Sequence, residues 1–460
     1  MEFALPIPDD ARRDLARGWL MLGLLSLLGS GVFSVLLVLA RTPYVQNVFP
    51  WVDFFRTALV VHVDLSVLVW FLAFGGALWS LNSTPRFLGF GRLALLLAAA
   101  GALVIAVAPF FGAGQPLMSN YIPVLQHPLF FTGLLLFAGG FSVLTLRAMG
   151  AIPPVGQWME GAAALRFGLN TAAVSAMLAL IALVWTWLTM PEILSGKPYY
   201  ELLFWGGGHV LQFTYTLLML VAWLWLASAS GVRLSISPRV ALIFFGFGLV
   251  TVFFTPVIYY SYPVTSAEHH RLFTWLMRYG GSLAALPLSI ALLHGLWRAD
   301  RARGEAQPLR AALIASMILF GAGGAIGFLI HGTNVTIPAH YHGNIVGVTL
   351  AFMGLTYHLF PQFGYRLPDL KLARLQPWLY GGGQLLHVMG LVISGGYGVQ
   401  RKVAGAEQGL DTLGRVVGMG LMGLGGLIAI AGGFLFLYVC YGAMRPGRVS
   451  RKSPAMIREP

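Results

Sequence analysis

Long apolar segments follow one another along nearly the whole of this 460-residue chain. Each has about 20 residues or more, the length at which an α-helix crosses the hydrocarbon core of a bilayer. The backbone polar groups of such a segment find no water inside a bilayer, so the segment must be helical. We expect twelve membrane-spanning helices, near residues 15–40, 54–81, 89–112, 124–149, 163–190, 198–229, 237–261, 270–298, 308–332, 339–363, 374–398 and 411–443.

The composition excludes a soluble globular protein, because 57% of the residues are hydrophobic and only 10% are charged. We predict an all-α polytopic membrane protein with one transmembrane domain over residues 1–460 and short tails at both ends. Most of the 29 Lys and Arg residues fall on the side of the predicted termini. By the positive-inside rule both termini are then cytoplasmic. The net charge of +13 therefore reflects topology and lipid contact, not nucleic-acid binding.

Six histidines from four separate regions fall in the outer half of the predicted bundle. Two of them, His340 and His342, are one residue apart at the outer start of a predicted helix. Side chains two positions apart on an α-helix point about 200° away from each other, so this turn can place one imidazole on each of two faces. Imidazole is a preferred ligand of iron and copper. The remaining four are His62, His209, His269 and His270.

The segments around these histidines, VVHVDLSVLVWF, FWGGGHV, AEHHRLF and AHYHG, resemble those of the catalytic subunit of the haem–copper oxidase superfamily. That superfamily includes oxygen reductases and nitric oxide reductases. The resemblance covers all twelve spans and implies a haem–copper oxidase-like bundle with two haems, expected to be b-type. It implies a low-spin haem between His62 and His342 and a high-spin haem on His340. A third metal, called B and either copper or iron, would be bound by His209, His269 and His270.

The residue four positions after His209 bears on the choice of gas. It is a tyrosine in the main oxygen-reducing class and a glutamate in the usual nitric oxide reductases, whereas here it is Phe213. Gln212 lies on nearly the same helix face as His209 and offers a neutral amide to a bound ligand. The segment HGTNVTIPAHYHG resembles the nitric oxide reductases, which have a similar glycine–threonine run before their paired histidines. We therefore expect reduction of nitric oxide to nitrous oxide.

A terminal oxygen reductase is the alternative function. One oxygen-reducing branch takes its active-site tyrosine from the helix that corresponds to 237–261, which here ends in Tyr259 and Tyr260. The favoured interpretation of these residues, however, is that they are tyrosines of the membrane interface. Glu268, next to His269, is a candidate proton relay or a solvated loop residue. A membrane transporter is the remote alternative, but the sequence shows no pair of broken helices in two repeats.

The partners follow from what the chain lacks. Its single cysteine, Cys440, excludes a thiolate copper site and a Cys-x-x-Cys-His attachment site for a covalent haem. We expect a companion subunit whose soluble outer domain carries haem c or copper, together with a gaseous substrate and the lipid of a bacterial-type cytoplasmic membrane. Arg56 is a candidate partner of a haem propionate, or an arginine that extends to the interface.

Overall fold

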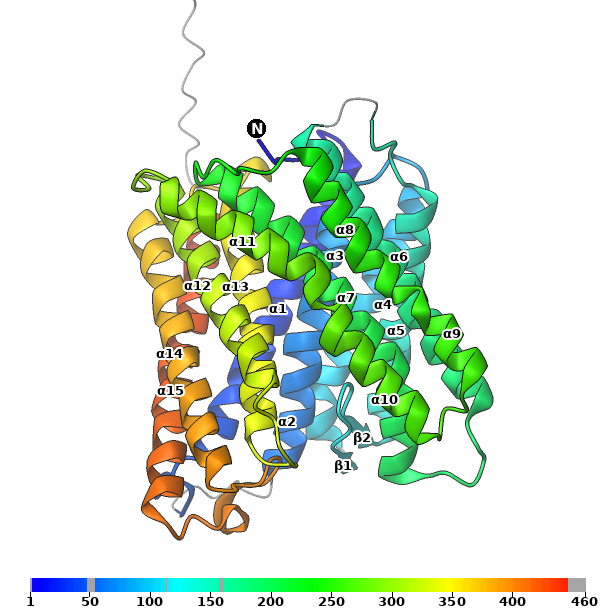
Figure 1. Cartoon of the computed structure of the whole chain (residues 1–460), viewed down its shortest axis with the longest axis vertical. Coiled ribbons are helices and arrows are strands. Elements are labelled where there is room, and N and C mark those ends of the chain that lie inside the picture. Colours follow the sequence, from blue (N-terminus) through cyan, green and yellow to red (C-terminus); the bar gives the residue numbers. More distant parts are fainter. Residues whose placement is uncertain (1, 48–53, 113, 157–159, 446–460) are drawn as a thin grey trace, which may run out of the picture.

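The computed structural model describes residues 2–47, 54–112, 114–156 and 160–445, which form an almost entirely helical bundle (Figure 1). The predicted C-terminal tail, residues 446–460, lies outside the described residues. The helices are α1 Ala11–Leu39, α2 Phe55–Val63, α3 Trp70–Leu81, α4 Leu88–Val107, α5 Pro128–Gly150, α6 Gly161–Thr189, α7 Gly196–Ala229, α8 Pro238–Val252, α9 Phe254–Ser261, α10 Ala267–Trp275, α11 Ser282–Arg298, α12 Ala306–Gly327, α13 Thr336–Gln362, α14 Leu370–Gly396 and α15 Leu413–Met444.

In some cases two successive helices together form one membrane span. A π-helical turn, Asp64–Val69, joins α2 to α3, and a second, Leu276–Gly280, joins α10 to α11. The described residues contain 11 helical spans that are long and apolar enough to cross a membrane. The twelfth predicted span, 374–398, is the 27-residue helix α14 (Leu370–Gly396), whose polar residues lower its hydropathy. The prediction of an all-α polytopic fold is confirmed.

A small β-hairpin interrupts the helical pattern between α4 and α5. Strand β1 (Gln115–Leu117) pairs antiparallel with β2 (Val124–Gln126). The predicted start of the fourth span at residue 124 was therefore too early, because α5 begins at Pro128, which suits the first turn of a helix. The hairpin lies at the end of the bundle opposite the start of α1, and we call that end the hairpin end (Figure 1).

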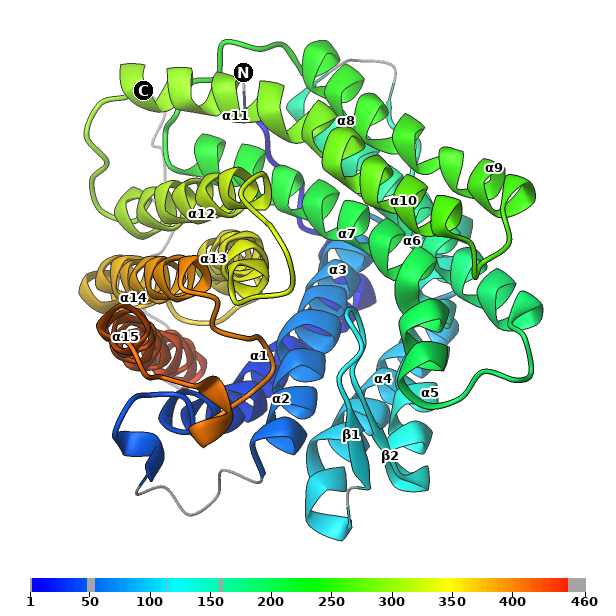
Figure 2. The ribbon, with the colours of Figure 1, turned by 60° about the horizontal axis from the view of Figure 1, so that its bottom comes forward.

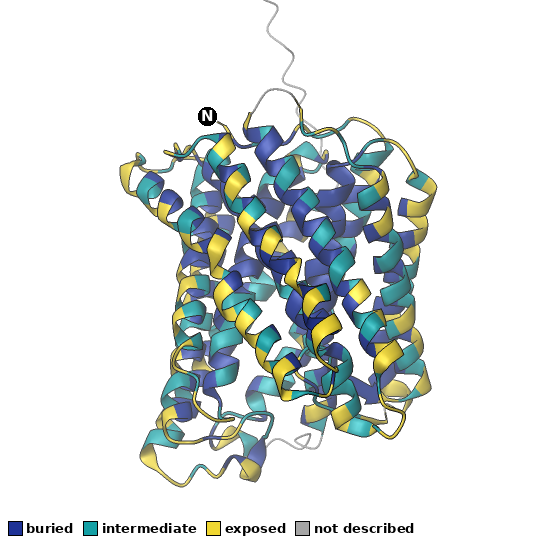
Figure 3. Cartoon of the chain, turned by 45° about the vertical axis from the view of Figure 1, so that its right-hand side comes forward, coloured by how far each residue is buried: buried dark blue, intermediate teal, exposed yellow. Residues whose placement is uncertain are grey.

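Burial divides the bundle into an apolar rim and a packed interior. Exposed positions form stripes along the outward faces of the peripheral helices, and the central helices are mostly buried (Figure 3). Within an apolar 18-residue stretch of each helix, 94% of the residues of α7 and 83% of those of α13 are buried. These two helices carry three of the six predicted ligands, His209, His340 and His342, so half of the predicted ligands lie on the most enclosed helices.

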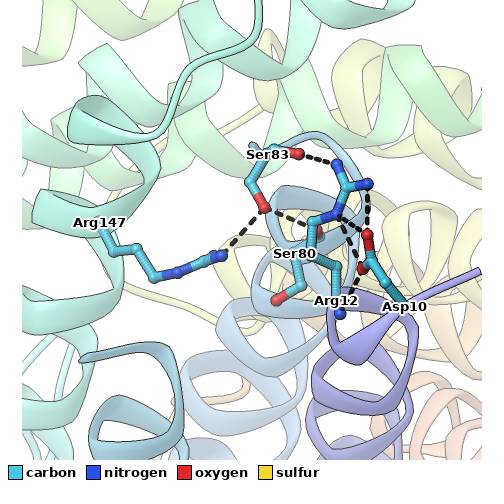
Figure 4. A network of polar contacts seen from close by, with 5 residues as sticks. All are labelled: Asp10, Arg12, Ser80, Ser83 and Arg147. Carbon is cyan, nitrogen blue, oxygen red and sulfur yellow. Dashed lines mark hydrogen bonds and ion pairs between the residues drawn. The ribbon is translucent and has the colours of Figure 1, made fainter. Parts of the chain in front are cut away.

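A polar cluster fastens the end of the bundle where α1 begins (Figure 4). Arg12 donates to both carboxylate oxygens of Asp10, with Nε–O distances of 2.9 and 3.0 Å, and to the backbone oxygen of Ser83 after α3. The buried Arg147 of α5 donates to the Ser83 hydroxyl at 3.1 Å. The Arg12 guanidinium holds the pKa of Asp10 below its usual range. The cluster thus joins α1, α3 and α5 by hydrogen bonds at one level.

Helices α14 and α15 approach each other so closely that only glycine fits at their contact. A Cβ atom built on Gly425 would lie 2.3 Å from the backbone nitrogen of His387 and 2.6 Å from the oxygen of Gly383. Backbone atoms cannot move aside as a side chain can. Small residues at such contacts are what allow membrane helices to pack without a hydrophobic driving force.

We therefore expect Gly425→Ala to destabilise the protein by about 1–3 kcal/mol, because the methyl group overpacks a contact between two backbones. Thermal unfolding in detergent, followed by intrinsic fluorescence, measures the change. Gly420→Ala on the same helix is the matched control, since a Cβ there meets nothing within 4 Å. Equal midpoints for the two variants would contradict the expectation.

Candidate active site

One large cavity runs through the interior of the bundle. Its volume is about 1710 Å³. Pockets for single ligands usually measure roughly 300–1,000 Å³, so this cavity has room for more than one large group. Its lining is mainly apolar and comes from elements far apart in the sequence. Five histidines line it: His62, His209, His340, His342 and His387.

The paired histidines of α13 face two different neighbours, as their spacing predicted. His340 turns toward α12, where its Nδ1 donates to the backbone oxygen of Gly323 at 2.7 Å. Gly327, one turn further along α12, leaves room for the ring, because a Cβ there would lie 2.8 Å from it. His342 turns toward α14 and packs edge-on against His387, with ring centroids 4.9 Å apart.

His62 on α2 is held by helix α1. Its Nδ1 lies 3.0 Å from the backbone oxygen of Ser30 and 2.9 Å from the Ser30 hydroxyl. A carbonyl oxygen only accepts hydrogen bonds, so Nδ1 carries the proton and Nε2 keeps its lone pair. This arrangement, in which the second ring nitrogen donates to a carbonyl, is typical of metal-binding histidines.

The same arrangement recurs at other imidazoles of the site. Nδ1 of His209 donates to Trp205 at 2.7 Å, and Nδ1 of His270 donates to Ser266 at 3.0 Å, in both cases to a backbone oxygen one turn earlier. Nδ1 of His387 donates to the backbone oxygen of Met422 on α15 at 2.9 Å. With His62, four imidazoles therefore leave Nε2 unprotonated and without a hydrogen bond among the described residues, whereas Nε2 of His340 lies 3.5 Å from the amide nitrogen of Asn344.

Sequence reasoning missed the position of His387. His387 lies near the middle of a predicted span and was not among the six candidate ligands, whereas the structure places its ring against that of His342. The contact depends on how closely α14 approaches α13 and α15. Two adjacent glycines of α15, Gly425 and Gly426, face His387 and are the signal that could have indicated this contact.

The three histidines predicted for metal B lie in one neighbourhood but are not arranged around a common point. The Trp205 ring contacts both His209 and His270, with centroid distances of 4.6 and 4.8 Å. Phe273 contacts His209 and His269, at 5.8 and 5.0 Å. Among the described residues, no three His, Cys, Asp or Glu side chains converge closely enough to form a ready-made metal site.

The polar candidates near this group are placed differently from one another. Gln212 lines the cavity, as predicted from its spacing to His209. Tyr259 is buried with its ring 4.9 Å from that of His269, and its hydroxyl lies 2.6 Å from Thr186 Oγ1. Tyr260, by contrast, is 90% exposed. Glu268 is also exposed and does not line the cavity.

The cationic side chains that face the cavity at the hairpin end do not include Arg56, the candidate propionate partner from the sequence. Arg56 pairs with Glu407 at 2.8 Å, and both side chains are about half exposed. Arg41 faces the cavity instead, together with Arg401 and Lys402. The Nε and Nη2 atoms of Arg41 are buried and have no hydrogen-bond partner among the described residues. Burial lowers the pKa of Arg41 to about 10, so it stays charged at neutral pH.

Comparisons with known proteins agree with this geometry. The family described as cytochrome c and quinol oxidase polypeptide I matches residues 14–429. An uncharacterized protein of Rickettsia prowazekii (strain Madrid E) is 29% identical over 497 residues, covering 93% of this chain and 95% of that protein. An uncharacterized protein of Aquifex aeolicus (strain VF5) is 30% identical over 362 residues, covering 78% of this chain and 88% of that protein.

A solved structure shares the fold. A heme-copper terminal oxidase dimer determined by cryo-EM superimposes with a TM-score of 0.70 at 18% identity, over 95% of this chain and 85% of that one. Members of the family generally bind two haems and a copper or iron ion. The residues present fit two haems, because imidazole Nε2 atoms, an apolar cavity and the guanidinium nitrogens of Arg41 that lack a partner among the described residues match iron, macrocycle and propionate in turn. For the copper or iron ion only the donor type fits, since the three neutral imidazoles lie in one neighbourhood but do not converge on one point among the described residues.

The family match over most of the chain, the shared bundle and the histidines that line its cavity lead to one conclusion. The chain is an integral membrane protein that belongs to the haem–copper oxidase family, as its catalytic subunit I.

Proposed function

We propose that this protein reduces nitric oxide to nitrous oxide in a bacterial-type cytoplasmic membrane, with both termini cytoplasmic and the active site in the outer half. His62 and His342 would hold a low-spin haem, His340 a high-spin haem, and His209, His269 and His270 the metal B. A haem with one axial imidazole offers an open position to a gas, whereas a haem with two only passes electrons.

The observation that carries the choice of gas is the surface that α7 presents beyond His209. Phe213 is 2% exposed and packs into an apolar cluster with Val210, Ile258 and Phe273. It brings neither a phenol nor a carboxylate to the cavity. Reduction of dioxygen to water takes four electrons and four protons, and the main oxygen reductases use a phenol at this position as one source. Reduction of two nitric oxide molecules to nitrous oxide and water takes only two electrons and two protons.

Beyond His209, α7 presents three polar side chains to the cavity, those of Gln212, Tyr215 and Thr216, and Gln212 is the one nearest to His209 along the helix. Its amide can donate a hydrogen bond to a bound gas or orient a water molecule, but it cannot deliver a proton as a carboxylic acid does. The proposed metal B site thus has three neutral imidazoles and a neutral amide nearby, and no carboxylate from α7. Such a set of neutral ligands favours copper over iron at metal B.

Oxygen reduction is the second candidate, and Tyr259 is the specific residue that favours it. Its buried ring lies edge-on to His269, so a phenol does come near the proposed metal B from the span of α8 and α9. Its hydroxyl, however, donates to the backbone oxygen of Ala182 at 3.0 Å and meets Thr186. Both partners belong to α6, which directs the hydroxyl to a structural hydrogen bond.

Electrons would enter from the hairpin end. The chain has one cysteine, Cys440, which is buried, and it has no attachment motif for a covalent haem. We therefore infer a companion subunit whose soluble outer domain carries haem c or copper and donates to the haem of His62 and His342.

The two haems should be separable by mutation. We expect His340→Ala to remove the high-spin haem that binds carbon monoxide and to leave the low-spin spectrum largely intact. His62→Ala should do the reverse, because the two histidines are held by different helices. Optical spectra of the reduced proteins with and without carbon monoxide measure both signals. Loss of only the low-spin signal in both variants would show that the ligand assignment is mistaken.

Turnover on the two gases tests the proposed function itself. We expect nitric oxide reduction to exceed oxygen reduction when each gas is saturating, and we expect it to survive Tyr259→Phe, because that hydroxyl bonds to α6. Gas electrodes with an artificial electron donor give both rates, and Tyr260→Phe is the matched control at an exposed position. A vigorous oxygen reductase activity that Tyr259→Phe abolishes, with negligible nitric oxide turnover in the parent, would identify a terminal oxidase.

A further inference from the structure

The tip of the β-hairpin reaches a histidine of the site. Residues 118–123 connect β1 to β2, and the hairpin crosses the end of the bundle with its tip directed toward α7 (Figure 2). Tyr121 of this tip lines the cavity. Its ring centroid is 4.9 Å from that of His209, with the ring planes inclined by 53°. A second tip contact joins Tyr121 to Trp205, at 6.1 Å.

Helix α7 is shaped to receive this tyrosine. A Cβ atom on Gly208 would lie 2.2 Å from Cγ of Tyr121 and 2.7 Å from its Cβ. The clash would be with the root of the side chain, which is fixed by the loop, and not with a flexible end. Only glycine at position 208 therefore allows the Tyr121 ring to rest against α7 beside His209.

The tip is held in place from two sides. Lys402, between α14 and α15, donates to the backbone oxygen of Met118 at 2.7 Å and to the side-chain oxygen of Asn120 at 3.3 Å. Glu201, near the start of α7, accepts from the backbone nitrogen of Asn120 at 3.3 Å. Burial lowers the pKa of Lys402 to about 8, so the ammonium still predominates at pH 7. The residue before Tyr121 is thus bonded to two separate parts of the bundle.

We propose that Tyr121 is a positioning residue for His209, and that the hairpin tip is an active-site element. The imidazole of His209 is held by a hydrogen bond from its Nδ1 to the backbone oxygen of Trp205 and by contacts of its ring with the rings of Trp205, Phe273 and Tyr121. The hydrogen bond limits rotation of the ring, and the tyrosine closes the side of α7 that Gly208 leaves bare. Together they fix the direction of Nε2. This inference rests on the proposed role of His209 as a ligand of metal B.

Four variants test the inference: Tyr121→Phe, Tyr121→Ala, Gly208→Ala and the double variant Gly208→Ala/Tyr121→Ala. Copper and iron are measured by elemental analysis after dialysis of the purified protein against graded chelator, relative to low-spin haem, whose spectrum also reports correct folding. We expect Tyr121→Ala to weaken retention of metal B by about 10- to 100-fold, the usual cost of losing a group that orients a ligand. Tyr121→Phe keeps the ring and should retain metal B as the parent does.

The variants at Gly208 test whether the place of the Tyr121 ring against α7 is what holds metal B. Gly208→Ala should weaken metal B retention in the same direction, because it displaces the ring, and the double variant should be no worse than Tyr121→Ala alone. Gly246→Ala on α8 is the control, since a Cβ there meets nothing within 4 Å. Unchanged metal retention in Tyr121→Ala would overturn the inference. So would a Tyr121→Phe variant that keeps metal B but loses turnover, since that result assigns the role to the hydroxyl.

A reference variant separates this inference from the proposed function. His209→Ala should lose metal B and keep low-spin haem. If His209→Ala retains metal B, the proposed ligand set is wrong, and the proposed role of Tyr121 is wrong as well. If it loses the metal while Tyr121→Ala does not, only the inference about Tyr121 fails.

Discussion

Hydrogen bonds from imidazole Nδ1 to backbone carbonyls are the interaction on which the site depends. A helix carbonyl already accepts one bond from its own helix but has a second lone pair, and His62, His340 and His387 use such lone pairs on α1, α12 and α15. Each bond fixes the tautomer, the ring direction and the register of two helices at once. Packing inside a membrane supplies little hydrophobic driving force between helices, so directional bonds and close small-residue contacts must supply the order.

Close contacts at glycines are the second interaction that orders the helices. The three consecutive glycines of α7, residues 206–208, each receive a different neighbour. A Cβ at Gly206 would meet the Tyr259 hydroxyl, at Gly207 the backbone of α6, and at Gly208 the ring of Tyr121. The helix that carries His209 is thus surrounded on three sides just outside its ligand. Close contacts with three neighbours therefore account for the run of three glycines.

The sequence predicts those features that arise from a periodic or local pattern. The spans follow from apolar length, and the opposite faces of His340 and His342 follow from helix geometry. Contacts set by the approach of distant elements were not predictable. His387 joins the site only because α14 and α15 touch backbone to backbone, and Tyr121 enters through a hairpin too short to signal its fold. Arg41 rather than Arg56 faces the cavity, because Glu407, far along the chain, engages Arg56 at the surface.

The connectivity of the proposed low-spin haem site also sets an order of assembly. His62 depends on α1 and α2, the first elements to leave the ribosome, whereas His342 and its neighbour His387 belong to α13 and α14, and His387 is held by α15, the last helix. Chains emerge from the N-terminus, so the two halves of this site are separated by most of the synthesis of the protein. The early helices must wait in the membrane with the single imidazole of His62 until its partner helices are made. Completion of the haem pocket is therefore a late event in biogenesis, and it closes the bundle by joining its oldest and its youngest helices.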